Sequence, residues 1–507
     1  MPKPKSFLKE AKGKKKAAKQ VRELTPRFTI KWLIIWITDT PGVELEEAGE
    51  KWRAGDAAKS MRFFMRAIAT YDDGLQRHPG AFDLAYNKAR VQYEITQHPK
   101  LAAQLPAPQG ELLQIALESH RTALKLDQDN ADVLFNTAQV LTSLAETMSD
   151  SKHPGDEALT QAVSSLQEAI ELFQRCLMLQ EMKFSEMEEQ IQAMEPMGNQ
   201  PEESTPLAEP AEAAEAESND ESQEQWAAIV EPVTKNTLAD TAVAQLDTLT
   251  ALCNLLTFNP GEGGIGWVEE YSSGLVQTRL PMYVDGSDRQ YEAALARTKL
   301  ICAMNEVLYR GGHSNVDTYQ QEVGKAFGPD LDLSADPEGL CAKADALISF
   351  NSALGDVPPS DLESSNTALS ARWQSLSVAL DALTAASKIP DADNLPKIHL
   401  ARGDVEMHRW QLGISPWNYE MAQQNGATLL RNAQTYYRGA AALARRDRAS
   451  EEERDGSCKE AIAAAVGGET AKLDQLRTTR LNEVVAVAQD MVEDGMVNGT
   501  DMASLIS

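Results

Sequence analysis

The sequence is poor in cysteine, and the cysteines it has are not paired. Five cysteines stand singly in 507 residues, at Cys176, Cys253, Cys302, Cys341 and Cys458. An odd number without regular spacing excludes the disulfide framework of small secreted domains, and no Cys-x-x-Cys pair indicates a zinc site. Because most of them lie inside apolar helical patterns, we expect reduced, buried thiols of an intracellular protein.

Positive charge is also scarce. The chain has 48 Lys and Arg against 76 Asp and Glu, a net charge of -28. An acidic surface of this size disfavours nucleic acid and anionic membranes as direct partners, and it favours basic ones.

Long apolar runs are missing. The most apolar segment, residues 28–38, contains Lys31 and is too short to cross a bilayer, which requires about 20 residues. Three interpretations remain open for it: an interfacial anchor, a strand-like binding segment, or an error in the assembly of the coding sequence. We favour the third, because the helical pattern begins only after Pro41.

Motifs for cofactors, metals and covalent catalysis are missing too. The glycines of residues 261–266 have the spacing of a dinucleotide fingerprint, but a helix precedes them instead of a strand, and acidic residues follow. His399 and His408 are nine residues apart and face different directions on a helix. No Ser-His-acid or Cys-His signature is recognisable. We therefore expect no cofactor, no metal and no enzymatic activity.

The first 22 residues reverse the overall charge, with nine Lys and Arg against a single acidic residue. The densest lysines are Lys12, Lys14, Lys15, Lys16 and Lys19. Such a cluster is typical of a nuclear localisation signal or an RNA-contacting tail, and a merely solubilising disordered end is the alternative. Too many lysines precede any apolar run for a signal peptide. We expect a nuclear or cytoplasmic protein that is not secreted and does not enter a membrane.

What the sequence does contain is a nine-residue pattern of small and bulky apolar positions. It covers residues 60–68, 116–124, 169–177 and 433–441. Its two small positions are seven residues apart, so they share one helix face that a neighbouring helix can approach closely. A second match, between residues 83–91 and 132–140, begins the helix that precedes two of these copies. The repeating unit is therefore a helix pair, which we expect at 43–78, 81–127 and 130–184.

The residues of these pairs resemble the tetratricopeptide repeat. Ala54-Gly55-Asp56 followed by the pattern from Ser60 to Ile68 is similar to it, and so is the pattern from Ala116 to Leu124 followed by Leu126-Asp127. The spacing is degenerate, because the standard repeat has about 34 residues and these patterns recur after 56 and 53. The resemblance implies an all-α, TPR-like solenoid of antiparallel helix pairs, whose first helices line an inner groove.

Composition divides the chain into five regions. These are a disordered basic tail with the anomalous apolar segment (1–41), the TPR-like repeats (42–184), an acidic flexible linker (185–225), a second helical-repeat region (226–495, clearest at 396–446) and a disordered tail (496–507). Two alternatives stay open for the linker: its early part extends the preceding helix, or the segment is a polyanion that shields a basic partner or competes with RNA for it. In the second helical region the periodicity predicts helices at 233–257, 287–309, 316–326, 336–353, 360–388, 394–412, 417–447 and 468–495, and a loop at 260–286.

The polar residues on the first helices are the candidates for holding a partner segment. They are Asn87, Lys88, Arg90, Asn136 and Gln139. Asparagine amides both donate and accept hydrogen bonds, which suits an extended peptide. Hydrogen bonding between helices is an equally good explanation. The clamp that many TPR co-chaperones use for a terminal carboxylate is not expected, because Leu45 and Gly49 replace its first lysine and asparagine.

These features predict a non-enzymatic protein that binds a partner, which we expect to be a basic segment, in a TPR-like groove. It would act as an adaptor or as a dedicated chaperone or assembly factor. Acidic solenoids with a lysine-rich tail resemble the escort factors of ribosomal proteins. The alternative is a scaffold subunit of a larger nuclear or cytoplasmic complex, in which the outer helix faces matter more. A catalytic helical domain hidden within residues 226–507 is a third hypothesis.

Overall fold

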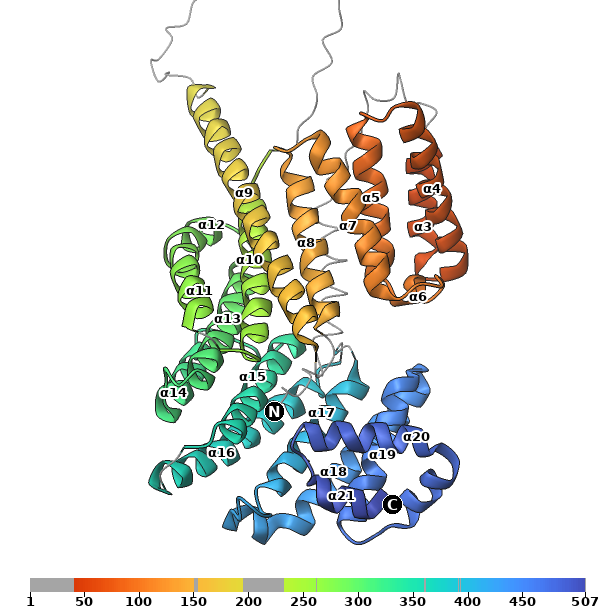
Figure 1. The fold of residues 1–507 in the computed structure, drawn as a ribbon. Helices are drawn as coiled ribbons and strands as arrows, with labels where there is room; N and C mark the ends of the chain where they lie inside the picture. Colours follow the sequence, from red (N-terminus) through yellow and green to blue (C-terminus); the bar gives the residue numbers. More distant parts are fainter. Residues whose placement is uncertain are drawn as a thin grey trace, which may run out of the picture.

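All regular structure in the described part of the chain is helical. The computed structural model describes residues 41–149, 154–194, 232–260, 262–359, 362–390, 392 and 394–506 (Figure 1). Successive helices form pairs joined by short connections, and each pair packs against the next. The fold is therefore an all-α solenoid, as the sequence predicts. No helix among the described residues is both long and apolar enough to cross a membrane.

The three predicted helix pairs of the first region are confirmed. They are α3 (Pro41–Arg53) with α4 (Ala57–Arg77), α5 (Phe82–Gln97) with α7 (Gln109–Leu126), and α8 (Ala131–Met148) with α9 (Asp156–Met194). A single short turn, α6 (Pro99–Ala102), lies in the connection between α5 and α7. The excess over a standard repeat length is thus taken up by longer helices and by this connection.

Small residues set the distance between α3 and α4. The side chain of Asp56 caps α4 by accepting a hydrogen bond from the Lys59 amide at 2.9 Å. The Ser60 hydroxyl donates to the Gly49 carbonyl at 2.7 Å, which ties the two helices together. A side chain at Gly49 would overlap the buried ring of Phe64. The small positions of the pattern therefore act as predicted, by letting a second helix come close.

The second region continues the same architecture. Its helices are α10 (Lys235–Leu256), α13 (Gln290–Arg310), α14 (Val316–Ala326), α15 (Pro337–Asp356), α16 (Leu362–Ala386), α17 (Leu395–Gln411), α18 (Glu420–Asp447) and α20 (Ala471–Glu493). The fourth copy of the pattern lies in α18, where Ala433, Tyr437 and Ala440 are fully buried. Gly403 of α17 lies against the ring of Tyr437, as expected for the small residue of the first helix of this pair.

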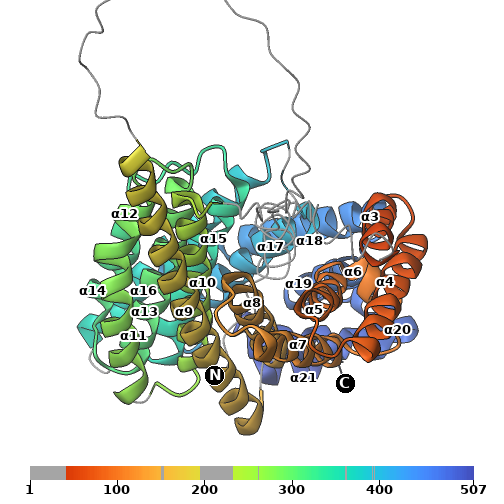
Figure 2. The same cartoon turned by 90° about the horizontal axis from the view of Figure 1, so that it is seen from above.

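The two helical regions share one hydrophobic core. Ala145 of α8 and Leu177 of α9 belong to the same buried cluster as Leu246 of α10 and Leu300 of α13. In Figure 2, α5, α8, α10, α15 and α17 lie toward the middle of the molecule, whereas α4, α11 and α14 lie toward its rim. We call the surface where successive first helices (α3, α5, α8, α10, α13, α15) meet one another the inner face.

The predicted loop at 260–286 is wrong. It is helical, with α11 (Glu262–Gly274), a π-helical turn (Leu275–Arg279) and α12 (Leu280–Val284). Val268, Leu275 and Tyr283 are buried in the core that contains α10, and Gly264 lets α11 pack against Leu256. The glycines favour a loop by propensity, but this packing outweighs their preference.

Two predicted boundaries are also wrong. The linker does not begin at 185, because α9 continues to Met194; its remaining residues, 195–225, lie outside the described part. The tail at 496–507 is not disordered, since α21 (Gly499–Ile506) follows α20 and its Met502 is buried together with Met496 and Val497. Three apolar residues on one short segment are enough to pack it onto the last pair.

One helix gave no sequence signal. In α19 (Ser450–Val466) three glutamates open the first turn and alanines fill the second half. Cys458, Ile462 and the alanines from Ala461 to Ala465 are all buried, so the helix is enclosed on most sides. A helix enclosed in this way has no contrast between a polar and an apolar face, and periodicity cannot reveal it.

Candidate protein-binding surface

Carboxylates recur at intervals of seven residues on the first helices. Seven residues are about two turns, so the members of each pair lie one above the other on the same helix face. The pairs are Asp240 and Asp247 on α10 and Glu338 and Asp345 on α15, and Asp132 and Glu146 on α8 are two such intervals apart.

Three of these carboxylates, one each from α8, α10 and α15, act on Lys299 of α13. Its ammonium lies 3.0 Å from the Asp247 carboxylate of the neighbouring helix α10. Burial alone would lower the pKa of Lys299, but Asp247, Glu338 and Glu146 together raise it. Carboxylates of α8, α10 and α15 therefore act on one lysine of α13. We call these four residues the acidic patch of the inner face.

A second ion pair connects α10 and α13 about two helical turns from the first. Arg289, the residue directly before α13, donates to Asp240 of α10 at 2.7 Å. Thr142 of α8 and Thr248 of α10 share a hydrogen bond of 3.1 Å nearby. Polar contacts of this kind, repeated between successive first helices, make the inner face polar, acidic and well ordered.

At the N-terminal end the inner face carries a mixed charge cluster. Glu46 of α3 accepts hydrogen bonds from Tyr71 of α4 and Arg90 of α5. Arg53 of α3 pairs with Glu94 of α5. Burial raises the pKa of Glu46 and of Glu94 even though the arginines oppose it. Arg90, a predicted groove residue, is thus bound within the fold.

The other predicted groove residues divide into two groups. Asn136 donates to the Tyr86 hydroxyl at 2.7 Å, and Lys88 pairs with Asp72 of α4, so both make contacts between helices. Gln139 is buried, and its backbone carbonyl accepts a hydrogen bond from the Tyr93 hydroxyl at 3.4 Å. The side-chain oxygen of Gln139 is buried without a hydrogen-bond partner. Asn87 is half-buried, and its side chain makes no hydrogen bond to the described residues. Of the five, Asn87 has the most capacity left for a partner, because the Gln139 side-chain oxygen is buried out of a partner's reach.

Several sequence features stay untested. The lysines Lys12, Lys14, Lys15, Lys16 and Lys19 and the apolar segment 28–38 lie outside the described residues. The acidic patch, in turn, escaped the sequence analysis because its members come from four helices. The seven-residue spacing of acids on first helices is the signal that could have revealed it.

The five cysteines and two of the histidines, His120 and His408, are withdrawn from solvent. All five cysteines are buried, and burial raises the pKa of Cys302 to about 12 and that of Cys458 to about 11. Burial lowers the pKa of His120 to about 4 and that of His408 to about 3. Among the described residues, no group of three or more His, Cys, Asp or Glu side chains could hold a metal.

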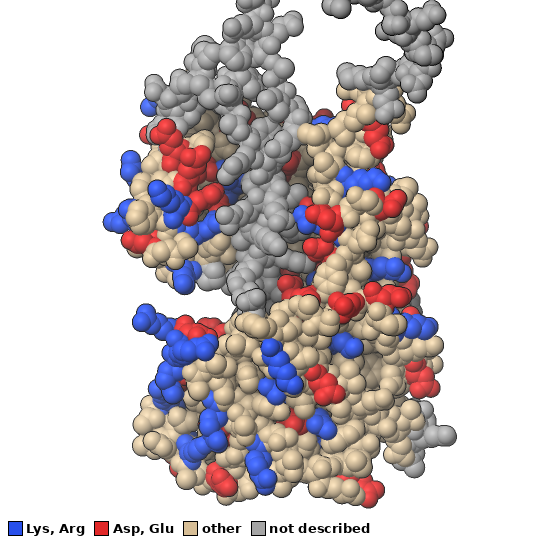
Figure 3. All heavy atoms as spheres, turned by 180° about the vertical axis from the view of Figure 1, so that it is seen from behind, with Lys and Arg blue, Asp and Glu red and all other residues tan. Residues whose placement is uncertain are grey.

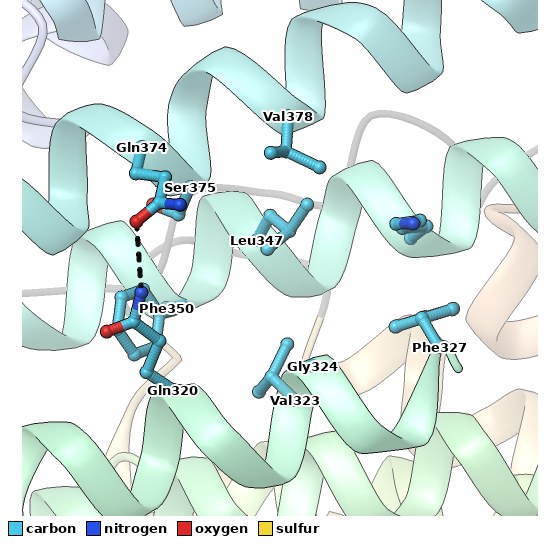
Figure 4. A pocket seen from close by; sticks show the side chains of 10 residues that line it. Gln320, Val323, Gly324, Phe327, Leu347, Phe350, Gln374, Ser375 and Val378 are labelled. Carbon is cyan, nitrogen blue, oxygen red and sulfur yellow. Dashed lines mark hydrogen bonds between the residues drawn. The ribbon is translucent and has the colours of Figure 1, made fainter. Parts of the chain in front are cut away.

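A small hollow lies between α14, α15 and α16, away from the acidic patch. It has a volume of about 230 Å³, and Val323, Phe327, Leu347 and Phe350 line its apolar part (Figure 4). Gln320 donates to Gln374 at 3.4 Å across one end. Its walls come from the second helices α14 and α16 as well as from α15, so it is a separate feature from the inner face.

Comparison with known proteins places the chain next to a protein whose name describes no activity. No family model matches. The chain is 28% identical over 417 residues to the UPF0656 protein C926.02 of Schizosaccharomyces pombe, covering 78% of this chain and 82% of the relative. It is also similar to a designed circular tandem repeat protein with novel repeat topology and enhanced subunit contact surfaces, with 12% identity, a TM-score of 0.30 and coverage of 97% and 98% of the two chains. That likeness is too slight to carry an argument, so the solenoid rests on the helix pairs themselves.

Proposed function

We propose that the chain is a non-enzymatic interaction protein that binds a basic segment of a partner protein on its inner face. In this role it would be an adaptor or a dedicated chaperone or assembly factor of TPR-like type. The observation that carries the proposal is the acidic patch, where Glu146, Asp247 and Glu338 act on Lys299. Carboxylates gathered on one ordered surface attract a cationic segment and increase its rate of association.

The spacing of the helices suits an extended partner. Packed helices lie about 8–10 Å apart, and an extended chain advances about 3.3 Å per residue. A segment that crosses successive first helices therefore meets a new helix about every third residue. The successive first helices are α8, α10, α13 and α15. Lysine or arginine at every third position would therefore meet the carboxylates of α8 and α10 at neighbouring steps and that of α15 two steps beyond α10, with Lys299 of α13 between them.

The TPR-like assignment is supported by the α3–α4 pair and by the α17–α18 pair. Ser60 and Ala67 of α4 and Ala433 and Ala440 of α18 occupy the small positions of the pattern and are all fully buried. In tetratricopeptide domains the first helices line the groove, which is also where the acidic patch lies. Asn87 of α5 adds a side-chain amide toward the N-terminal end of the same face.

The test neutralises two carboxylates of the patch and leaves its partly exposed ion pair in place. In Glu146→Gln/Glu338→Gln the Asp247–Lys299 pair stays intact, so folding is little affected. The matched control is Glu186→Gln/Glu189→Gln on the exposed end of α9, which removes the same charge elsewhere. We expect a labelled peptide with lysine at every third position to bind the patch variant about fivefold to tenfold more weakly, because two favourable charges are lost.

Fluorescence anisotropy at low and at high salt measures this, and binding should weaken as salt rises. An equal loss of peptide affinity in the patch variant and in the control would show that only net charge matters. It would contradict a specific binding site at the acidic patch. Binding that does not depend on salt would contradict a basic partner. The variants are also compared by affinity capture and mass spectrometry, in which the patch variant should lose basic proteins preferentially.

A scaffold subunit is the second candidate, favoured by the exposed end of α9. This helix runs beyond the beginning of α10, which packs beside it (Figure 1), and Met182 and Ile191 are 51% and 54% exposed. Apolar side chains left open on an ordered helix are typical of surfaces that another subunit covers. Size-exclusion chromatography of the isolated chain separates the two candidates, since a stable monomer favours the chaperone and aggregation without partners favours the subunit.

A further inference from the structure

The outer face of α18 differs in charge from the rest of this acidic chain. The 26 residues from Met421 to Arg446 contain four arginines and no Asp or Glu. Arg431, Arg438 and Arg445 are seven residues apart, so they lie on one line along the helix, with about 10 Å between neighbours. All three are exposed.

Uncharged polar residues fill the same line. The exposed positions Gln424, Thr428 and Thr435 alternate with the arginines at steps of three and four. Further cations lie at its C-terminal end, where Arg446 and Arg448 are exposed. In Figure 3, Lys and Arg side chains gather over the part of the molecule that the C-terminal helices form. We call the line from Gln424 to Arg445 the arginine stripe.

The stripe is only partly neutralised by its neighbours. Arg438 donates to Glu460 of α19 at 2.7 Å, and Arg445 donates to Glu453 at 2.9 Å. Lys472 of α20 shares Glu460 with Arg438. Arg431 makes no ion pair with the described residues, because α19 ends at Val466 before it could supply a third carboxylate. The paired arginines are 60% and 67% exposed, and such exposed pairs are weak enough to be exchanged for a competing anion.

We propose that the arginine stripe binds the phosphate backbone of single-stranded RNA without sequence preference. Arginine, threonine and glutamine are the residue types that contact phosphate and sugar oxygens. A phosphate backbone needs charge and hydrogen-bond donors but no apolar anchor. An acidic protein partner would need such an anchor, and the stripe offers only Ala442 between its arginines. The surface is separate from the acidic patch, so the chain would hold two partners of opposite charge on two faces.

The test must first remove the basic tail, which would bind RNA as well. The background protein is therefore the full chain with Lys12, Lys14, Lys15, Lys16 and Lys19 changed to Gln. On this background we compare Arg431→Gln/Arg438→Gln/Arg445→Gln with a matched control, Arg62→Gln/Arg66→Gln/Arg77→Gln. The control removes three exposed arginines from α4, another second helix, where Asp72 and Asp73 lie among them.

The probe is a fluorescently labelled single-stranded RNA of mixed sequence. We expect the background protein to bind it and to lose about 20-fold in affinity between 50 and 200 mM salt, as three phosphate contacts require. The stripe variant should bind at least 10-fold more weakly at low salt and lose most of this salt dependence, whereas the control should change less than twofold. Circular dichroism confirms that both variants remain helical.

Three results would overturn the proposal. One is a background protein that does not bind the RNA at low salt. Another is an equal loss in the stripe variant and in the control, which would make binding a matter of net charge. The third is polyglutamate displacing the RNA as effectively as unlabelled RNA does, which would make the stripe a surface for acidic protein segments.

Discussion

The first helix pair, α3–α4, and the α17–α18 pair of the C-terminal part contain the same arrangement of three residues in two environments. In each, a carboxylate of the first helix accepts a hydrogen bond from a tyrosine of the second helix and pairs with a cation of the next first helix. The N-terminal set is Glu46, Tyr71 and Arg90, and the C-terminal set is Asp404, Tyr437 and Lys459. In both, a glycine of the first helix, Gly42 or Gly403, lies against the tyrosine ring.

The two sets differ in how far they are withdrawn from water. The side chains of Asp404 and Lys459 are only 2% and 5% exposed, and two hydrogen bonds of 2.8 and 2.9 Å join them. The side chain of Arg90 is 18% exposed, and Glu94 attracts it as well as Glu46. The C-terminal set is thus fully buried within the fold. In the N-terminal set Arg90 is partly exposed on the inner face, which we assign to partner binding. The same arrangement therefore stabilises the fold at the C-terminal end, whereas at the N-terminal end it leaves Arg90 partly accessible to solvent.

The largest effect is expected from breaking the C-terminal set. Asp404→Asn removes the carboxylate that accepts two hydrogen bonds from the buried Lys459 ammonium. Asp494 and Asp455 also act on this ammonium but Asp404 has the largest effect, so we expect a loss of about 3–5 kcal/mol in local unfolding free energy. Glu46→Gln should lose only about 1–2 kcal/mol, because Arg90 keeps Glu94 and some water. Hydrogen exchange read separately on α18 and α4 measures both, since a solenoid does not unfold as a single unit.

The double variant Asp404→Leu/Lys459→Met checks the cause. It removes both charges together, so most of the loss should be recovered. If it is as unstable as Asp404→Asn, the hydrogen bond to Tyr437 or the local packing is responsible. If the loss of local unfolding free energy in Glu46→Gln equals or exceeds the loss in Asp404→Asn, solvent exposure does not explain the difference between the two ends.

The glycines offer a second way to compare the two ends. A methyl group on Gly403 would lie 2.4 Å from the ring of Tyr437, and one on Gly42 would lie 2.5 Å from the ring of Tyr71. We expect Gly403→Ala to destabilise α18 by about 1–3 kcal/mol, because the ring is enclosed on all sides. Gly42→Ala should have a smaller effect, since α3 begins at Pro41 and its first turn can shift. Thermal melts and hydrogen exchange on α4 and α18 measure these losses of stability. Equal losses in Gly403→Ala and Gly42→Ala would contradict the expected difference between the two ends.

Acid should affect the two ends differently. The buried imidazoles have pKa values lowered to about 3 for His408 and about 4 for His120, against an ordinary value of 6.5. The unfolded chain therefore binds more protons below pH 6.5, and the stability present above pH 6.5 is lost as the pH falls, by up to about 1.4 kcal/mol per unit for each group. The loss continues to about pH 3 at His408 but ends near pH 4 at His120. The raised pKa of Glu46 and of Glu94 acts in the opposite direction at the N-terminal end.

Exchange rates of α17 and α7 between pH 7 and pH 4 test this expectation. His408→Gln should flatten the pH dependence at α17 and leave α7 unchanged, and His120→Gln should do the reverse. A wild-type α17 that is equally stable at pH 7 and pH 4 would show that His408 is not held neutral by burial.

The contrast also shows how far sequence reasoning reaches in this chain. Helices with one apolar stripe, such as α14 with its buried Val316, Tyr319 and Val323, have the bounds that the sequence predicts, because periodicity records a single buried face. The nine-residue pattern located all four pairs that carry it, since small residues mark close helix contacts. Periodicity missed α11 and α19, in which glycine or a fully enclosed environment removes the signal.

The candidate site was only partly predictable for the same reason. Sequence position placed Asn87, Arg90 and Asn136 on first helices, as the structure does. It could not show that Arg90 pairs with Glu46 or that Asn136 bonds to Tyr86, because these partners come from other helices. The acidic patch depends on four helices at once, and only their packing brings its members together.

The smallest expected effects concern these groove asparagines, and they separate structural from binding roles at the N-terminal end. Asn136→Ala removes the hydrogen bond to Tyr86 and should lower the local stability of α8 by about 1 kcal/mol. Asn87→Ala removes no bond to the described residues, so exchange of α5 should stay unchanged while binding of the lysine-containing peptide weakens by about threefold. Exchange and anisotropy on the same two variants measure both quantities. If Asn87→Ala leaves binding unaltered, the partner does not reach the N-terminal end of the inner face, and the open N-terminal set of Glu46, Tyr71 and Arg90 serves stability alone.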